Sequence, residues 1–183
     1  HVICEKPVTL SSDDLQARSD ASLTYRRLST VHKNRRWDED FLAVKRIFDE
    51  NTLGRVFNIE SRVHGSRGVP GDWRNKKRQG GGMILDMMCH WRYVLDNLFG
   101  EVKSVSCLGA THIPTRWDEA GQPYACTADD AAYATCELVG HSGEPVVAQL
   151  NMSWATRVNR EDLVTFHVDG THGSAVAGLS SCK

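Results

Sequence analysis

An acid and an imidazole stand four residues apart inside an apolar stretch of the chain. Residues 80–90 read GGGMILDMMCH, which places three glycines before a helical run that carries Asp86 and His90. Side chains four residues apart lie on one face of a helix, so we expect these two groups to be neighbours. Titratable groups on the apolar side of a helix are costly unless they are paired or take part in a reaction. This pair is the first candidate site.

Histidine is suited to acid–base chemistry because its side chain titrates near neutral pH. Oxidation of a secondary alcohol needs a base within hydrogen-bond reach of the hydroxyl, and His90 can supply one. The alternative is a structural histidine, since a single histidine in an apolar helix is more often a hydrogen-bonded core residue than a catalyst. The acidic neighbour Asp86 favours the catalytic interpretation.

The N-terminal part of the chain predicts a strand, a helix and a second strand. Residues 1–4 form an apolar strand that Pro7 ends, because proline cannot donate to a sheet. A capping box at Ser11 predicts a helix that ends near Thr24, and residues 28–32 predict the second strand. Such a unit is typical of a parallel sheet, with Lys6 at the carboxyl end of its first strand.

The remainder of the chain predicts two helices and an antiparallel or mixed sheet. Asp38 is the expected N-cap of a helix that stops at Gly54, and residues 83–98 form the most apolar helix. An irregular loop at residues 65–71 continues through Trp73. Strands are predicted at residues 56–63, 102–113, 131–139, 146–154 and 164–169, with 174–177 as a hairpin partner. The predicted fold class is α+β, with α/β character at the N-terminal end.

Composition argues against several classes of function. The 183 residues are 40% hydrophobic and 25% charged with a net charge of -1, which favours a soluble protein without nucleic-acid or membrane partners. The densest basic run, from Arg74 to Arg78, is interpreted as a solvated loop. Because neither a transmembrane-length apolar run nor a signal-peptide pattern is found, we expect a cytoplasmic setting.

Cysteine and histidine spacing gives no metal-binding pattern. The six cysteines include no C-x-x-C pair, so we expect reduced and mostly buried thiols. The histidines outside the candidate site also lack ligand spacing, and we therefore predict that there is no metal site.

Five motifs follow one another along the chain: Glu5-Lys6-Pro7, NRRWD at residues 34–38, LGRV at residues 53–56, Trp73, and the glycines before Asp86 and His90. In this order they resemble the glucose-fructose oxidoreductase/inositol dehydrogenase/rhizopine catabolism (Gfo/Idh/MocA) family. The resemblance is strong over residues 1–100 and looser over residues 102–178. It implies a Rossmann domain that binds NAD or NADP, followed by a domain with a large, mostly antiparallel open sheet, helices on one face and a frequent role in oligomerisation.

The resemblance divides the chain after residue 34. Residues 1–34 correspond to the C-terminal remnant of a dinucleotide-binding domain, and residues 35–183 to a substrate-binding and oligomerisation domain whose C-terminal end we expect to be truncated. The G-x-G-x-x-G turn of dinucleotide-binding proteins is absent, because Gly65, Gly68 and Gly71 have the wrong spacing. We therefore expect this fragment to be inactive by itself.

The resemblance also implies a catalytic triad of Lys6, Asp86 and His90. In this triad His90 takes the hydroxyl proton while hydride passes to the nicotinamide, and Lys6 stabilises the developing alkoxide. Asp86 binds a neighbouring substrate hydroxyl or holds the imidazole in one tautomer.

Further residues are candidates for binding rather than catalysis. The motif Glu5-Lys6-Pro7 is assigned to the cofactor, while Trp73 and Arg74 either line a substrate pocket or pack beneath a lid. Glycines at the helix start allow the backbone to approach substrate or nicotinamide closely.

The sequence leaves three alternative functions open. The first is an NAD(P)-dependent oxidoreductase acting on a secondary hydroxyl of a sugar, polyol or inositol-like substrate, and forming homo-oligomers through the C-terminal sheet. The second is a catalytically silent sheet module used for oligomerisation. The third, a metal- or thiol-binding protein, rests on the scattered cysteines and histidines alone.

Overall fold

The computed structural model describes residues 1–66, 69–157 and 163–178 of the chain. These residues form two units, His1–Arg35 and Arg36–Lys183, each of which is described by itself. In the part of the chain that the structure describes, no helix has the length and apolar character needed to cross a membrane.

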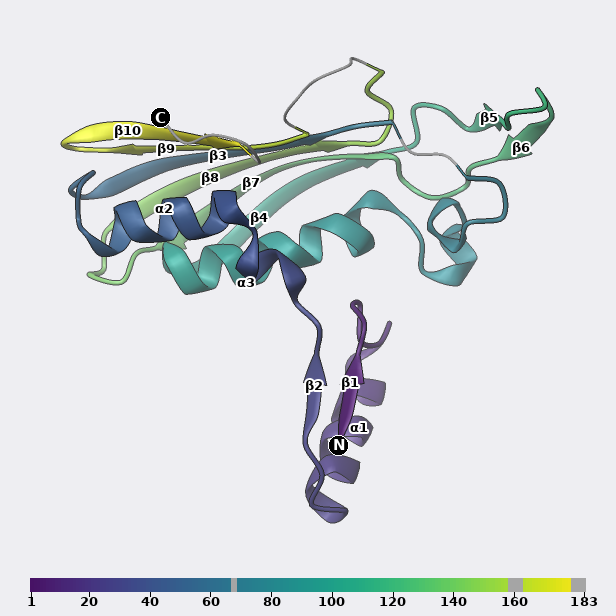
Figure 1. The fold of residues 1–183 in the computed structure, drawn as a ribbon, viewed down its shortest axis with the longest axis horizontal. Coiled ribbons are helices and arrows are strands. Elements are labelled where there is room, and N and C mark those ends of the chain that lie inside the picture. The colour runs from purple at the N-terminus through teal and green to yellow at the C-terminus, as the bar shows by residue number, and fades with distance from the viewer. Residues whose placement is uncertain (67–68, 158–162, 179–183) are drawn as a thin grey trace. The chain divides into compact units, whose positions relative to one another are not determined.

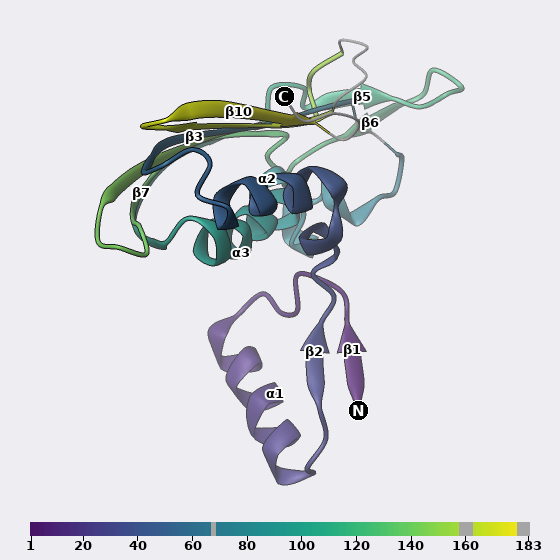
Figure 2. The ribbon, with the colours of Figure 1, turned by 60° about the vertical axis from the view of Figure 1, so that its left-hand side comes forward.

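The first unit is the predicted strand-helix-strand arrangement (Figures 1 and 2). Strand β1 (Val2–Cys4) pairs in parallel with β2 (Ser29–Val31), and helix α1 (Ser12–Thr24) connects them. The Ser11 hydroxyl accepts a hydrogen bond from the Asp14 amide at 3.1 Å, which confirms the predicted cap. Every residue of α1 is at least partly exposed, because the sequence gives this helix few apolar positions.

The second unit is organised around a mixed sheet, whose strands run in the order β10-β9-β3-β8-β7-β4 in the described residues. The strand bounds are β3 Val56–His64, β4 Glu101–Ala110, β7 Ala131–Val139, β8 Pro145–Ser153, β9 Val164–Gly170 and β10 Gly173–Gly178. Strands β3 and β8 pair in parallel, while the other neighbours pair antiparallel. The predicted α+β fold with a mostly antiparallel open sheet is confirmed.

Helices α2 (Glu39–Asp49) and α3 (Cys89–Leu98) cover one face of this sheet (Figures 1 and 2). Successive side chains of a strand point to opposite faces of the sheet. In β7, buried and exposed residues alternate from Ala132 onward, so one face of the sheet is covered and the other is open. The core joins both layers, as the rings of Trp91 on α3 and Phe166 on β9 pack with centroids 4.8 Å apart. This packing anchors α3, the helix that carries His90.

Two details of the predicted elements are wrong. Helix α2 begins after Asp38 as expected but ends at Asp49, and a turn through Asn51 at φ 52° precedes Gly54. Gly54 instead opens the approach to β3, with φ +66° and Thr171 Oγ1 only 2.6 Å from where a Cβ would lie. The strand predicted at residues 102–113 ends at Ala110, and the hairpin of β5 (Thr115–Trp117) and β6 (Pro123–Ala125) was not predicted.

The helix predicted at residues 83–98 consists of two kinds of helix. A π-helical turn, Ile84–Met88, runs directly into α3. Before it, short 3-10 turns at Trp73–Asn75 and Lys77–Gln79 occupy what we predicted to be irregular loop. Wide π turns inside helices occur often at functional sites, and this one carries Asp86.

Candidate active site

Two buried glycines at the start of the helix allow close packing, Gly81 against the Trp73–Asn75 turn and Gly82 against Asp129. A Cβ on Gly81 would lie 2.4 Å from the backbone oxygen of Trp73 and 2.5 Å from that of Arg74. Gly82 has φ +124°, and a Cβ there would lie 2.4 Å from Asp129 Oδ1. These close contacts are with the chain itself, and the expected approach of the backbone to substrate or nicotinamide stays a prediction.

Asp129 supplies acceptors for the first backbone amides of the helix. Its carbonyl oxygen accepts a hydrogen bond from the Met83 amide at 2.8 Å, and its carboxylate accepts one from the Ile84 amide at 2.8 Å. The next residue, Asp130, is fully buried and forms an ion pair with Arg116, whose Nη2 lies 3.0 Å from Oδ2. The helix start is therefore held by a firmly anchored segment that is 45 residues away in the sequence.

Asp86 is buried, with a side chain only 3% exposed, and lies 3.3 Å from Arg74 (Oδ1 to Nε). This approach is a charge contact that lacks the alignment of a hydrogen bond. Arg74 also contacts Asp72, with Nη1 3.4 Å from Oδ1, and its guanidinium lies 4.5 Å from the centre of the Trp73 ring. The structure thus brings together three predicted site residues, Trp73, Arg74 and Asp86.

His90 lies one turn after Asp86, on α3, and is buried. Its Nδ1 lies 2.7 Å from the hydroxyl oxygen of Tyr93, three residues further along the helix. Tyr93 is also buried, and the two rings meet edge to face with centroids 5.7 Å apart. The imidazole is therefore held in one orientation by a polar partner as well as by packing.

The predicted residues Glu5, Lys6 and Pro7 belong to the first unit. They follow β1, so Lys6 stands beyond the carboxyl end of a parallel strand as expected, and the peptide bond between Lys6 and Pro7 is cis. The side chain of Glu5 pairs with His32, Oε1 to Nδ1 at 2.8 Å, and this hydrogen bond lowers the pKa of Glu5. A meeting of Lys6 with Asp86 and His90 remains a prediction.

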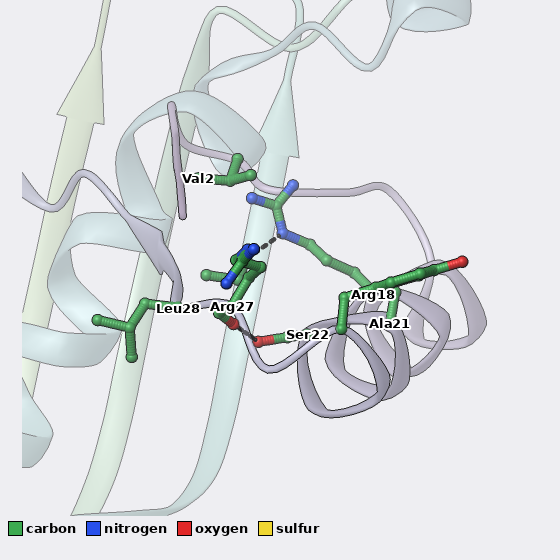
Figure 3. A pocket seen from close by; sticks show the side chains of 8 residues that line it. Val2, Arg18, Ala21, Ser22, Arg27 and Leu28 are labelled. Atoms are coloured by element: carbon green, nitrogen blue, oxygen red, sulfur yellow. Dashed lines mark hydrogen bonds between the residues drawn. The ribbon is translucent and has the colours of Figure 1, made fainter.

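A hollow of about 480 Å³ in the first unit lies between α1 and the two strands (Figure 3). Its wall includes Val2, Ala21 and Leu28, and Arg18 crosses it to donate a hydrogen bond from Nε to Ser29 Oγ at 2.8 Å. None of the predicted site residues lines it. Small side chains on α1 leave this space open, so we interpret it as loose packing between helix and strands.

Three residues of the site were not predicted from the sequence: Asp72, Tyr93 and Asp129. Tyr93 could have been found, because a residue three positions after His90 on a helix lies beside it. Asp72 precedes a turn of only three residues, which the loop pattern did not predict. Asp129 had no local signal, since its contacts with the helix start depend on the folding of the sheet.

The described residues contain no cluster of three or more histidine, cysteine or acidic side chains able to hold a metal ion. Cys126 and Cys136 are buried thiols, and burial raises the pKa of the Cys136 thiol. Cys107 is exposed and Cys4 and Cys89 are half-buried, so the prediction that most thiols are buried is wrong for the described cysteines, and Cys182 lies outside the described residues. The geometry therefore concentrates the candidate chemistry at Asp86 and His90.

Comparison with known proteins shows the family to which this chain belongs. The model of the GFO/IDH/MocA C-terminal domain matches residues 41–176. The chain is 42% identical over 190 residues to D-xylose dehydrogenase of Paenarthrobacter nicotinovorans, covering 100% of the chain and 49% of that protein. It is 31% identical to the scyllo-inositol 2-dehydrogenase (NADP(+)) of Bacillus subtilis strain 168 over 58% of the chain and 30% of that protein.

Solved structures share the fold. The chain superposes on an NAD-binding protein from Listeria innocua with a TM-score of 0.80 and 35% identity, covering 100% of this chain and 48% of that one. It also superposes on levoglucosan dehydrogenase in complex with NADH and L-sorbose, with a TM-score of 0.80 and 23% identity over 98% of this chain and 48% of that one. These two relatives, the D-xylose dehydrogenase and the L. innocua protein, match the whole of this chain, and the chain spans about half of their length.

Proposed function

This chain belongs to the Gfo/Idh/MocA family, and we propose on that basis that it serves an NAD(P)-dependent oxidoreductase. The reaction moves hydride between the nicotinamide and a secondary hydroxyl of a sugar, polyol or inositol-like substrate, in the cytoplasm. The observation that carries this proposal is the buried Asp86, held by Arg74 one helical turn before a buried and oriented His90.

The proposed roles follow from the chemistry of each side chain. His90 exchanges the proton of the reacting hydroxyl, and Asp86 accepts a hydrogen bond from a neighbouring hydroxyl. Lys6 donates to the reacting oxygen and stabilises negative charge on it. Trp73 offers an apolar face to the carbon skeleton of the sugar.

The charge balance of the site supports a neutral substrate. Arg74 contacts two carboxylates, those of Asp72 and Asp86, so its charge is already compensated. An acidic sugar would have to compete with both carboxylates for this guanidinium, whereas a neutral polyol can use the acceptor oxygens as they stand.

The first unit fits the dinucleotide-binding role proposed for residues 1–34. In open α/β sheets, ligands bind beyond the carboxyl ends of parallel strands, and Glu5, Lys6 and Pro7 follow the end of β1. These residues would contact NAD or NADP, which supplies the hydride acceptor. Residues 35–183 would then provide the substrate site and the oligomerisation surface.

The test uses two proteins, because the relatives are longer than this chain. It uses the 183-residue chain and a second form joined behind the N-terminal part of the P. nicotinovorans enzyme, which this chain does not cover. NADH and NADPH binding is followed by fluorescence, and reduction of NAD and NADP is followed with a panel of pentoses, hexoses, inositols and aldonates.

We expect cofactor binding and sugar-dependent reduction by the joined form. His90→Ala should lower turnover by about 100-fold or more while leaving the thermal midpoint nearly unchanged. His141→Ala, in the exposed turn between β7 and β8, is the matched control and should leave turnover intact. A folded joined form that neither binds cofactor nor turns over any sugar would reject the dehydrogenase proposal.

The second candidate function is a silent oligomerisation module, favoured by the uncovered face of the sheet. Leu108 and Tyr133 are exposed there and lie opposite each other across β4 and β7. Both candidates propose that a second copy of the chain covers this face. Light scattering at several concentrations measures the association, and activity in the joined form separates the two candidates.

A further inference from the structure

The contact between His90 and Tyr93 joins two buried side chains of one helix. Nδ1 of the imidazole lies 2.7 Å from the phenolic oxygen, a distance typical of a strong hydrogen bond. A phenylalanine would fill the same space without a polar atom that must be satisfied in the interior. The hydroxyl therefore has a polar task, and the imidazole of His90 is a partner for it.

An imidazole held at Nδ1 exchanges protons through its other nitrogen, Nε2. For Nε2 to accept a proton from an alcohol, the neutral ring must carry its hydrogen on Nδ1. That hydrogen then points at the oxygen of Tyr93, which accepts it. If the phenol donated to Nδ1 instead, Nε2 would already carry the hydrogen and could not act as a base.

We propose that Tyr93 is the positioning residue that keeps His90 in the Nδ1-protonated tautomer, with Nε2 as the base. This inference rests on the proposed oxidoreductase function, because the tautomer matters only if His90 exchanges the substrate's proton. Tyr93 takes the part that a carboxylate plays beside the histidine of many hydrolases, but with a neutral acceptor.

The chain contains a second pair of the same chemistry that serves as a control. His112 Nε2 lies 3.1 Å from the hydroxyl oxygen of Tyr133, and this pair is exposed on the sheet. Replacing the phenol there makes the same chemical change beside a histidine that has no role in the proposed reaction.

The direct test reads the tautomer in the 183-residue chain without cofactor or substrate. Long-range proton–nitrogen correlation spectra of histidine labelled with 15N are recorded at about pH 8.5, where an ordinary imidazole is neutral. His90→Gln identifies the signals of His90. We expect hydrogen on Nδ1 and a lone pair on Nε2, and a shift of this preference in Tyr93→Phe but not in Tyr133→Phe. Any other protonation pattern of His90 in the parent chain overturns the proposal, whether or not the enzyme is active.

The kinetic test uses the joined form described above. Tyr93→Phe should lower kcat by about 10- to 100-fold with little change in KM, because a ring in the wrong tautomer still fills the site. Tyr124→Phe, on β6 of the β5–β6 hairpin, should retain the parent values. If Tyr93→Phe keeps the parent kcat, or loses kcat only in proportion to folded protein measured by circular dichroism, the hydroxyl does not position the base.

Discussion

The Arg74–Asp86 contact allows a quantitative test of how the site is held together. We predict that Arg74→Met and Asp86→Asn each destabilise the chain, and that the double variant loses about 2 kcal/mol less than the sum of the single losses. The reason is that Arg74→Met leaves the buried Asp86 without the Arg74 charge, and Asp86→Asn leaves Arg74 with Asp72 alone, whereas the double variant removes both charges of the contact.

The magnitude follows from the geometry. Two unit charges 3.3 Å apart attract by about 5 kcal/mol at an effective dielectric constant of about 20. Desolvation of the buried carboxylate offsets part of this attraction, and Asp72 continues to neutralise Arg74 when Asp86 is changed. Because Arg74 is 26% exposed, we place the coupling below the range of about 3–5 kcal/mol for breaking a fully buried pair.

The assay is urea unfolding of the four chains of the cycle, followed by far-ultraviolet circular dichroism and tryptophan fluorescence. The control cycle uses Arg92 and Asp96, a pair 2.9 Å apart on the surface of α3, for which we expect about 0.5 kcal/mol or less. A coupling at Arg74 and Asp86 no larger than that of the control would refute the view that a buried charge pair organises the site.

Two further predictions concern the framework around the site. Gly81→Ala should destabilise the fold by about 2 kcal/mol or more, since its Cβ would meet backbone oxygens. Gly173→Ala is the control, because its Cβ would meet open space and the change should be nearly neutral. Equal thermal midpoints for the two variants would contradict this explanation. Hydrogen bonds from Asn58 and, to a lesser extent, Ser174 hold the pKa of Asp169 below its ordinary range. The ionised carboxylate therefore stabilises the fold at pH values above its pKa in the unfolded chain. This contribution is lost as the pH falls through the lowered pKa of the folded chain. Urea midpoints measured from about pH 6 down to about pH 2 should therefore converge for the parent and Asp169→Asn at the acid end, and a constant difference would count against this linkage.

Local patterns were sufficient for much of the fold. The strand at Ala131–Val139 was predicted with its observed bounds, and from Ala132 onward its residues alternate between buried and exposed positions, as the period of a strand requires. The cap at Ser11 was also predictable, since the hydroxyl and the amide that it accepts from are three residues apart. The α+β class and the identity of Asp86 and His90 as candidates follow from signals of this short range.

Longer-range features were not predictable in the same way. The parallel pairing of β3 with β8 and the hairpin of β5 and β6 depend on which strands meet when the sheet forms. The end of α2 was placed too late because Gly54 was read as a cap, while its close approach is to Thr171 across the fold.

The sequence by itself determined which side chains could do chemistry, because residue type and helical spacing are local properties. Tertiary structure decided their state: Asp86 is paired with Arg74, both Asp86 and His90 are buried, and the helix start is capped by Asp129. The physical reason is that charge compensation and capping depend on atoms a few ångströms apart in space. Folding of the sheet brings those atoms together from segments that are distant in the chain.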